Sequence, residues 1–273
     1  MLGAIIGDIV GSPFEGGPAV SKDFPLFSAR SHATDDTVMT IAVADALLRD
    51  ASAPPFVDAL KEWGRRYPDA GYGLRFLLWV MSAERSPYGS WGNGSAMRVS
   101  PCAWYATSLE QAEDLARRSA CVTHDHPEGI RGAQATAGAI YLARSQASHA
   151  QIREYVRTTH GYDLSRSLDE IRASSSFDES CRGTVPEALT AYLDSSGFLD
   201  AVRNAVSIGG DTDTLAAITG AIAEAEYGVP ASVATQALDA LDERMRGVLD
   251  AWARAGLSHG VVVPDGDADR LRP

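Results

Sequence analysis

Helical periodicity dominates this chain, and patterns typical of β-strands are nearly absent. Apolar residues repeat on one helix face from residue 38 to 47 and again from 56 to 63. The apolar segment 74–81 is expected to be buried, and the single β-branched run, 261–263, could form a short edge strand. Further helices are predicted at residues 127–144, 152–159, 185–195, 199–206, 215–227 and 232–255. The sequence therefore predicts an all-α fold.

Length and composition allow one sizeable core, because the chain has 273 residues of which 45% are hydrophobic. Segment 127–144 is rich in glycine and alanine, which lets neighbouring helices approach closely. No linker rich in proline and serine divides the chain, and a boundary at 174–176 would separate motifs that belong together. We expect one domain over residues 1–273.

The chain is acidic, with a net charge of -12 and an isoelectric point near 4.9. Nonspecific binding to nucleic acids or anionic membranes needs a cationic surface, so neither is expected. No stretch reaches the length of a membrane span, and the apolar residues 2–10 lack the basic leader of a signal peptide. Cys102, Cys121 and Cys181 form no metal-binding spacing and indicate buried thiols in a reducing compartment. A cytoplasmic protein is predicted.

Two acid-rich tetrads stand near opposite ends of the chain, residues 34–37 (Thr-Asp-Asp-Thr) and 211–214 (Asp-Thr-Asp-Thr), and each precedes an apolar helix pattern. Helix starts favour acidic oxygens through capping and the helix dipole. If the two helix starts meet, four carboxylates converge, and they cannot all stay ionised without cations. Hard oxygen ligands suit Mg²⁺, Mn²⁺ or Ca²⁺, so the pattern favours a site for two metal ions.

The alternative interpretation is that each tetrad is only a helix cap, which is the commoner role of such a cluster. Capping needs one short polar side chain, whereas both tetrads carry a surplus of charge. Gly209-Gly210 before the second tetrad also indicates backbone brought close to another group. We therefore prefer the metal interpretation.

Three further segments carry candidate site residues. Glu15 lies between Gly11 and Gly16 in a loop, where it could be a movable acid or base or an extra metal ligand, whereas Asp8 is expected to be structural. The turn Gly92-Asn93-Gly94, which is expected to open a helix, could hold a phosphate on its backbone amides, although such a motif alone is more often an ordinary turn. Arg98 could support the anion or pair with an acid.

His124 is the better candidate for a hydrogen bond to substrate, and for His126 a capping position in a solvent-facing loop is a nearly equal alternative. A zinc site is discounted because no second His or Cys pair accompanies them. No serine or cysteine stands in a nucleophile-elbow context, so covalent catalysis has no candidate.

In order along the chain, these motifs resemble those of the ADP-ribosylglycohydrolase family, which includes the bacterial dinitrogenase reductase-activating glycohydrolase. The resemblance covers residues 3 to about 228 and includes Cys181-Arg182-Gly183-Thr184-Val185-Pro186. It implies a compact, orthogonal all-α bundle with a binuclear Mg²⁺ or Mn²⁺ centre and an ADP-ribosylated protein or small molecule as substrate. The metal ligands that it implies are Thr34, Asp35, Asp36, Asp211, Asp213 and Thr214.

Residue roles also follow from the resemblance. It implies substrate contacts from Phe14, Gly92, Asn93, Gly94, Ser95, Ala96, Met97 and His124. Glu15, or one of the metal-binding carboxylates Asp35 and Asp36, would act as acid or base in hydrolysis of the glycosidic bond. The acceptor, whether arginine, serine, an O-acetyl group or a nucleobase, stays open.

Two other functions remain possible at this level. The same ligands suit a two-metal phosphohydrolase that cleaves the pyrophosphate of ADP-ribose or a related nucleotide. A non-catalytic ADP-ribose binder of the same fold is the other, although the complete ligand set argues against it.

Overall fold

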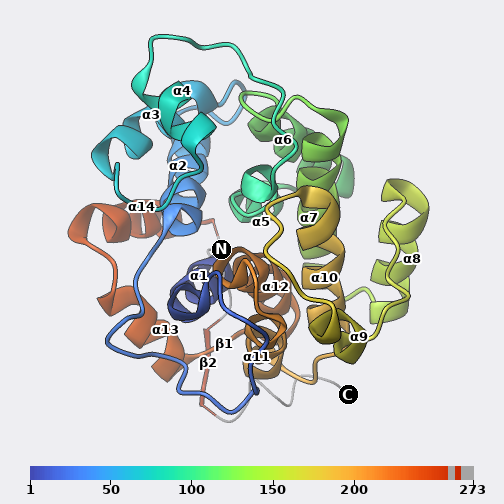
Figure 1. Ribbon diagram of the computed structural model, residues 1–273. Helices are drawn as coiled ribbons and strands as arrows, with labels where there is room; N and C mark the ends of the chain where they lie inside the picture. Colours follow the sequence, from blue (N-terminus) through green and yellow to red (C-terminus); the bar gives the residue numbers. More distant parts are fainter. Residues whose placement is uncertain (258–261, 266–273) are drawn as a thin grey trace.

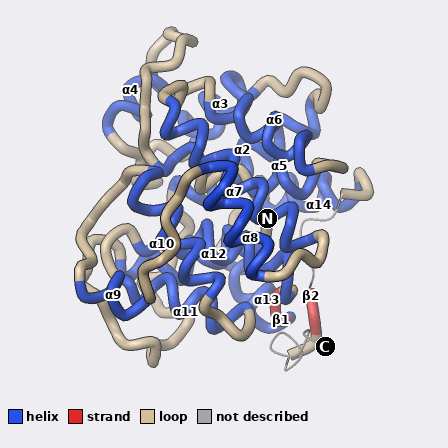
Figure 2. The backbone as a smooth tube through the Cα atoms, turned by 90° about the vertical axis from the view of Figure 1, so that its right-hand side faces the viewer, coloured by secondary structure: helices blue, strands red, loops and turns tan. Residues whose placement is uncertain are grey.

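The computed structural model describes residues 1–257 and 262–265, and helices dominate this part of the chain (Figures 1 and 2). Two short 3-10 helices, η1 (Ser12–Phe14) and η2 (Asn93–Ser95), and one parallel strand pair, β1 (Val229–Pro230) with β2 (Val262–Val263), accompany them. The α-helices are α1 (Leu2–Gly11), α2 (Asp35–Arg49), α3 (Phe56–Arg66), α4 (Leu74–Met81), α5 (Ser100–Tyr105), α6 (Leu109–Ala120), α7 (Pro127–Arg144), α8 (His149–His160), α9 (Leu168–Ala173), α10 (Cys181–Leu193), α11 (Phe198–Ile208), α12 (Thr212–Tyr227), α13 (Ala231–Asp239) and α14 (Glu243–Arg254). The all-α prediction is confirmed.

Helices α1 and α12 lie against each other at the centre of the fold (Figure 1). Gly3, Gly7 and Gly11 recur every four residues and form one stripe of α1. A Cβ atom on Gly7 would lie 1.9 Å from the carbonyl oxygen of Ala216, and one on Gly11 would lie 2.4 Å from that of Thr212. This close contact brings the start of α12 beside the end of α1, and it places the second tetrad at the centre of the molecule.

The predicted helix over 232–255 is wrong in one respect, because the structure divides it into α13 and α14. The break falls at residues 240–242, where the side chain of Asp242 accepts a hydrogen bond of 2.9 Å from Met245 N and starts a new helix. Leu241 in the break is buried, so the turn is anchored in the core. The 261–263 expectation is met at 262–263, while Val261 lies outside the described residues.

Helices α5, α6 and α9 were not predicted. For α6 the signal is present, since Ser108 caps it by accepting a hydrogen bond of 3.1 Å from Gln111 N. The buried residues Ala112, Leu115 and Ala116 also follow helical spacing. The strongly polar composition of this helix hides that stripe from a search for apolar runs.

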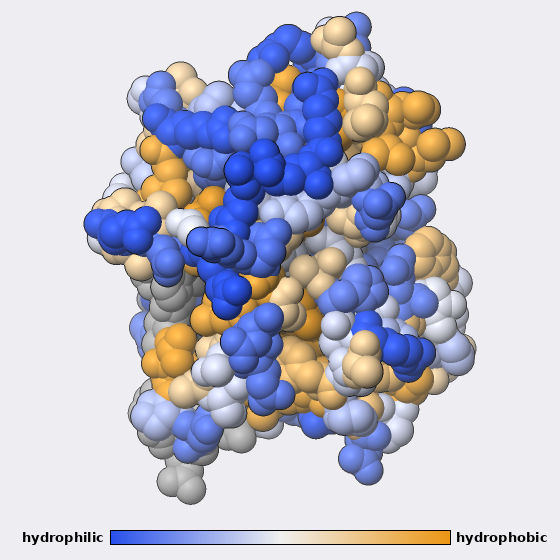
Figure 3. Space-filling view, turned by 90° about the vertical axis from the view of Figure 1, so that its left-hand side faces the viewer, coloured by the Kyte–Doolittle hydropathy of each residue, from blue (hydrophilic) through white to orange (hydrophobic). Residues whose placement is uncertain are grey.

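Helix α4 corrects the expectation that segment 74–81 is buried. Leu74, Leu78 and Met81 are 71%, 62% and 59% exposed, whereas Trp79 and Val80 are buried. Figure 3 shows hydrophobic side chains gathered at the upper right edge, on the side of the molecule where α4 lies. The helix is therefore a surface element with an apolar outer face.

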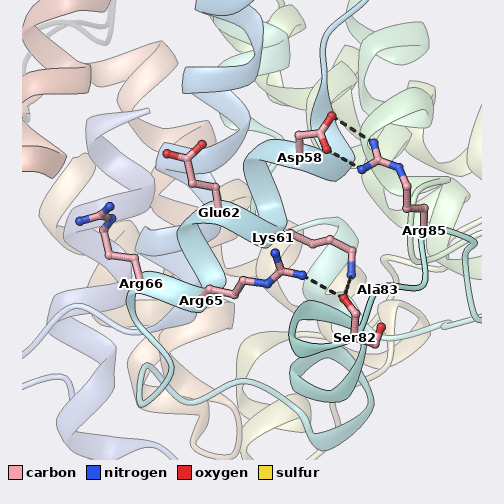
Figure 4. Close-up of a pocket in the computed structure, with 8 residues that line it drawn as sticks. All are labelled: Asp58, Lys61, Glu62, Arg65, Arg66, Ser82, Ala83 and Arg85. Atoms are coloured by element: carbon pink, nitrogen blue, oxygen red, sulfur yellow. Dashed lines mark hydrogen bonds and ion pairs between the residues drawn. The ribbon is translucent and has the colours of Figure 1, made fainter.

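Two cations from α3 hold the far end of α4. Arg65 donates from Nε to the carbonyl of Val80 at 2.8 Å and from Nη2 to that of Ser82 at 2.9 Å. Lys61 donates to the carbonyls of Trp79 and Ser82, and Figure 4 shows both side chains converging on Ser82. Carbonyls at a helix end lack partners within the helix and attract cations. Lys61 and Arg65, which line the pocket in Figure 4, therefore have a structural role, because they cap the end of α4.

The cysteines are unpaired, and Cys102 and Cys181 are buried as expected, whereas Cys121 is only partly buried. Burial raises the pKa of the Cys102 and Cys181 thiols to about 12. Over the described ranges, every helix is too short or too polar to traverse a lipid bilayer.

Candidate active site

The first tetrad is tied to α1 through Asp8. The backbone N–H and the hydroxyl of Thr34 donate to the Asp8 carboxylate at 3.0 and 2.7 Å. The backbone N–H of Thr37 donates to it at 3.0 Å, and the Thr37 hydroxyl also donates to it. Asp8 thus receives four hydrogen bonds, and its predicted structural role is confirmed. It fixes the start of α2 and leaves Asp35 and Asp36 outside this network.

The second tetrad follows a backbone crossing at Gly209-Gly210, as the sequence predicted. Both glycines have positive φ, +82° and +73°, and a Cβ atom on Gly209 would lie 2.5 Å from Ala19 N. Gly210 accepts a hydrogen bond of 2.8 Å from Gly16 N and donates one of 2.9 Å to the carbonyl of Gly17. The loop that carries Glu15 is therefore attached directly to the backbone before Asp211.

The two tetrads meet in space. The hydroxyl of Thr214 donates to Oδ2 of Asp36 at 3.1 Å. Carboxylate oxygens of Glu15, Asp211 and Asp213 lie within 4.8 Å of one another. Oδ1 of Asp36 is buried and has no hydrogen-bond partner among the described residues. A buried carboxylate oxygen without a donor is unusual in a folded protein, and it is the kind of atom that a cation would satisfy.

The electrostatics of this cluster disfavour its full ionisation. Burial, followed by the charges of Asp213 and Asp8, raises the pKa of both Asp35 and Asp36 well above the usual range of aspartate. Burial and the charge of Asp213 likewise raise the pKa of Asp211. The pKa of Asp8 rises to about 7 for the same two reasons, although its four hydrogen bonds oppose the rise. Divalent cations would relieve this repulsion.

A cavity of about 340 Å³ opens onto the cluster. Glu15, Asp35, Asp36, Asp211, Asp213 and Thr214 line it, together with Gly92, Asn93, Gly94, Met97 and His124. Four predicted residues do not line it. Phe14 packs on Phe24 with ring centroids 4.9 Å apart, Thr34 bonds Asp8, and the side chains of Ser95 and Ala96 are fully buried.

The Gly92–Gly94 turn is fixed from two sides. The side-chain amide of Asn93 donates to Oδ2 of Asp211 at 2.6 Å and to the hydroxyl of Thr184 at 2.9 Å. Its backbone N–H donates to the carbonyl of Glu179 at 2.7 Å, and Sγ of Cys181 donates to the carbonyl of Gly92. The segment around Cys181 therefore supports the turn and links it to the carboxylate cluster.

The turn differs in detail from the expected phosphate cradle. It forms η2 and does not open a helix directly, since α5 begins only at Ser100. The backbone N–H groups of Ala96 and Met97 donate to the carbonyl of Asn93. Those two amides are therefore not directed at a ligand. The backbone N–H groups of Gly92 and Asn93 are also engaged, with the Ser90 hydroxyl and the Glu179 carbonyl, so a cradle would have to use the amides that remain, such as that of Gly94.

His124 faces this turn, because a Cβ atom on Gly94 would lie 3.3 Å from its Nε2. The hydroxyl oxygen of Thr123 accepts a hydrogen bond of 3.0 Å from Arg98 and lies 2.7 Å from Nδ1 of His124. Burial, followed by the charges of Arg98 and Arg75, lowers the pKa of His124 well below its usual value. The ring is thus neutral, with Nδ1 bound to Thr123 and Nε2 beside the glycine turn.

Arg98 and His126 both have structural roles, because their hydrogen bonds stabilise neighbouring segments of the fold. Arg98 is fully buried and donates to the carbonyl of Ser119 at 2.7 Å as well as to Thr123, and within the described part of the chain no acid pairs with it. Nδ1 of His126 accepts a hydrogen bond from Glu128 N and caps α7, which is the alternative that the sequence left open for this residue.

Sequence reasoning missed several residues that line the cavity, notably Arg75, Tyr88, Trp91 and Glu179. Tyr88 and Trp91 directly precede the glycine turn, and aromatic residues at that place could have been noticed. Arg75 and Glu179 belong to no pattern in the sequence, and only the tertiary structure brings them to the cavity.

The helical fold thus carries a cavity lined by carboxylates that come from helix starts near opposite ends of the chain. Residues 1–264 match the family described as ADP-ribosylglycohydrolase, and the chain belongs to this family.

The chain is also similar to proteins that are named as ADP-ribosylhydrolases. ADP-ribosylhydrolase ARH3 of Mus musculus is 29% identical, over 84% of this chain and 83% of the relative. ADP-ribosylarginine hydrolase Tri1 of Pseudomonas putida is 27% identical, over 84% of this chain and 70% of the relative. A solved structure, of an ADP-ribosylglycohydrolase-related protein complex, superposes with a TM-score of 0.67 at 26% identity and covers 93% of this chain and 96% of that one.

Proposed function

We propose that this protein hydrolyses the glycosidic bond between ADP-ribose and an acceptor, with two Mg²⁺ or Mn²⁺ ions as cofactors. The observation that carries the proposal is the hydrogen bond from Thr214 to Asp36, which joins the two tetrads at the floor of the cavity. Family membership and the names of the relatives support the substrate class.

The residues present suit two hard cations. Asp35 and Asp36 come from the start of α2, and Asp211, Asp213 and Thr214 come from the start of α12. Thr34 could add its hydroxyl oxygen, which donates to Asp8 and accepts a hydrogen bond of 3.2 Å from Asp36 N. Oδ1 of Asp36, which is buried and has no hydrogen-bond partner among the described residues, is the atom that most directly supports a bound ion. When bound, the ions would orient the ribose hydroxyls and lower the pKa of a water molecule.

Glu15 is our candidate for the acid or base. Burial and the charges of Asp213 and Glu179 raise the pKa of its carboxyl group, which brings it nearer to the range useful for proton transfer. Its side chain is exposed at the cavity, whereas Asp35 and Asp36 are the alternatives from the cluster itself. The following Gly16 and Gly17 are bonded to Gly210, so a large movement of Glu15 would have to break those bonds.

The other end of the cavity would bind the pyrophosphate. The Gly92–Gly94 turn allows close backbone approach, and Nε2 of His124, which faces Gly94, would donate to a phosphate oxygen in the tautomer that carries the proton there. The acceptor would leave through the cavity mouth, and the acidic chain makes nucleic acid an improbable partner except as an ADP-ribosylated substrate.

We also infer that the chain acts as one domain in the cytoplasm. A single connected hydrophobic core links residues from α1 to α14, which supports one domain. Three unpaired cysteines are consistent with a reducing compartment.

The proposal is tested with a panel of ADP-ribosylated arginine, serine, nucleobase and O-acetyl substrates, each with Mg²⁺, with Mn²⁺ and with a chelator. We expect release of free ADP-ribose from at least one substrate, abolished by the chelator. Formation of AMP and a ribose phosphate would instead identify a phosphohydrolase, and binding without turnover would identify a non-catalytic binder.

A further inference from the structure

Arg75, at the start of α4, contacts the segment before the glycine turn, and both line the cavity. Its Nη2 donates to the carbonyl of Tyr88 at 2.6 Å, and its guanidinium lies over the Tyr88 ring, 5.0 Å from the centroid. The carbonyl and the ring together fix the position of the guanidinium group, although the side chain is exposed to solvent.

The place of Arg75 in the cavity follows from a chain of contacts. Asn93 binds Asp211 in the carboxylate cluster, and its neighbour Gly94 lies against His124. The ring of His124 in turn lies beside the ring of Tyr88, with centroids 6.1 Å apart, and the carbonyl of Tyr88 accepts the hydrogen bond from Arg75. Arg75 is thus at the glycine-turn end of the cavity, beyond His124.

The charge of Arg75 is unusual for this cavity. Its described lining includes six carboxylates, those of Glu15, Asp35, Asp36, Glu179, Asp211 and Asp213. The basic residues are Arg75, Arg98 and His124, and the pKa of His124 is lowered so that its ring is neutral. Arg98 is fully buried and donates to Ser119 and Thr123. Arg75 is therefore the exposed cation among the described lining residues.

If Arg75 had a purely structural role, we would expect more of its guanidinium N–H groups to donate to acceptors within the protein. Among the described residues, the Tyr88 carbonyl is the single acceptor that Arg75 reaches, and no carboxylate pairs with it. Nε and Nη1 therefore keep donors available for a ligand, and a guanidinium group matches two oxygens of a phosphate.

We propose that Arg75, positioned by Tyr88, is a substrate-binding residue that recognises the pyrophosphate of ADP-ribose. The inference rests on the proposed function, because that function supplies the ligand. It adds a side chain to the backbone turn and to His124, and it explains how a cavity lined by so many acids can accept a dianionic ligand.

The test compares ADP-ribose binding to the full chain and to the variants Arg75→Gln and Arg75→Lys by calorimetry with Mg²⁺ present. Arg85→Gln is the matched control, since Arg85 is an exposed arginine that pairs with Asp58 outside this cavity (Figure 4). Each titration is run at low and at high ionic strength, and thermal unfolding is recorded for every variant.

We expect Arg75→Gln to weaken binding by about tenfold or more, because a charge-assisted hydrogen bond is lost. Arg75→Lys should recover part of the lost affinity, and Arg85→Gln should bind ADP-ribose like the unaltered chain. High salt should reduce the difference in affinity between the unaltered chain and Arg75→Gln, because it screens the charge of Arg75. Unchanged binding by Arg75→Gln, equal losses in both glutamine variants, or a loss that is independent of salt and accompanied by a lower melting temperature would overturn the inference. If the unaltered chain itself fails to bind ADP-ribose, the proposed function fails.

Discussion

Thr214 and Asp36 are 178 residues apart in sequence, yet the hydroxyl of one donates to the carboxylate of the other at 3.1 Å. The helices that begin at these tetrads are brought together by α1, whose glycines contact α12 and whose Asp8 holds the start of α2. The candidate site is therefore a product of tertiary packing around one short helix.

Asp213→Ala should abolish metal-dependent hydrolysis without unfolding the protein. The carboxylate of Asp213 raises the pKa of Asp35, Asp36 and Asp211, so its removal relieves repulsion in the metal-free state. We expect at least about a 100-fold loss of kcat/KM and a metal-free melting temperature that is unchanged or higher. Asp250→Ala, at an exposed position of α14, is the control. Full activity of Asp213→Ala would exclude the proposed site.

Divalent metal should stabilise the protein more at pH 8 than at pH 5.5. The pKa values of Asp8, Asp35 and Asp36 are raised in the folded state, so without metal the folded state binds more protons than the unfolded one. The contribution of these three carboxyl groups to the stability of the metal-free protein is therefore lost as pH rises from about 4 through their folded pKa values. Mg²⁺ replaces those protons. Melting curves with Mg²⁺ and with a chelator at both pH values test this, and a shift independent of pH would contradict it.

Gly7→Ala should destabilise the fold strongly. The added Cβ atom would lie 1.9 Å from the carbonyl oxygen of Ala216, so α1 and α12 would have to separate. We expect a loss of about 3 kcal/mol or more in the free energy of unfolding, measured by urea denaturation.

Gly247→Ala is the matched control for that substitution. Gly247 lies within α14 and a Cβ atom there would meet nothing within 4 Å. Alanine is the better helix former, so a gain of about 0.5–1 kcal/mol is expected. Equal effects of the two substitutions would show that the contact between α1 and α12 is not tight.

Asn93→Ala should weaken metal binding although Asn93 is not among the proposed ligands. Its side-chain amide orients Asp211 through a hydrogen bond of 2.6 Å. Loss of such a supporting bond lowers metal affinity by about 10–100-fold. Titration with Mn²⁺ followed by calorimetry measures the change, and an unaltered affinity would remove Asn93 from the metal centre.

The sequence was sufficient to predict the helical class and to identify the two tetrads as candidate ligands, whereas their meeting in space entered only as a condition. Both depend on local chemistry, namely helical periodicity and a surplus of acid at helix starts. Residues such as Arg75 and Glu179 could not be predicted, because nothing near them in sequence indicates the cavity that they line. The exposure of Leu74 and Leu78 was also missed, since apolar composition alone does not tell which face of a short helix meets solvent.

The glycine contact between α1 and α12 has a consequence for biosynthesis. The first helix leaves the ribosome early, but its partner surface is encoded more than 200 residues later. A nascent chain can therefore not assemble the carboxylate cluster until α12 has also emerged, and α1 lacks the surface on which it packs until then.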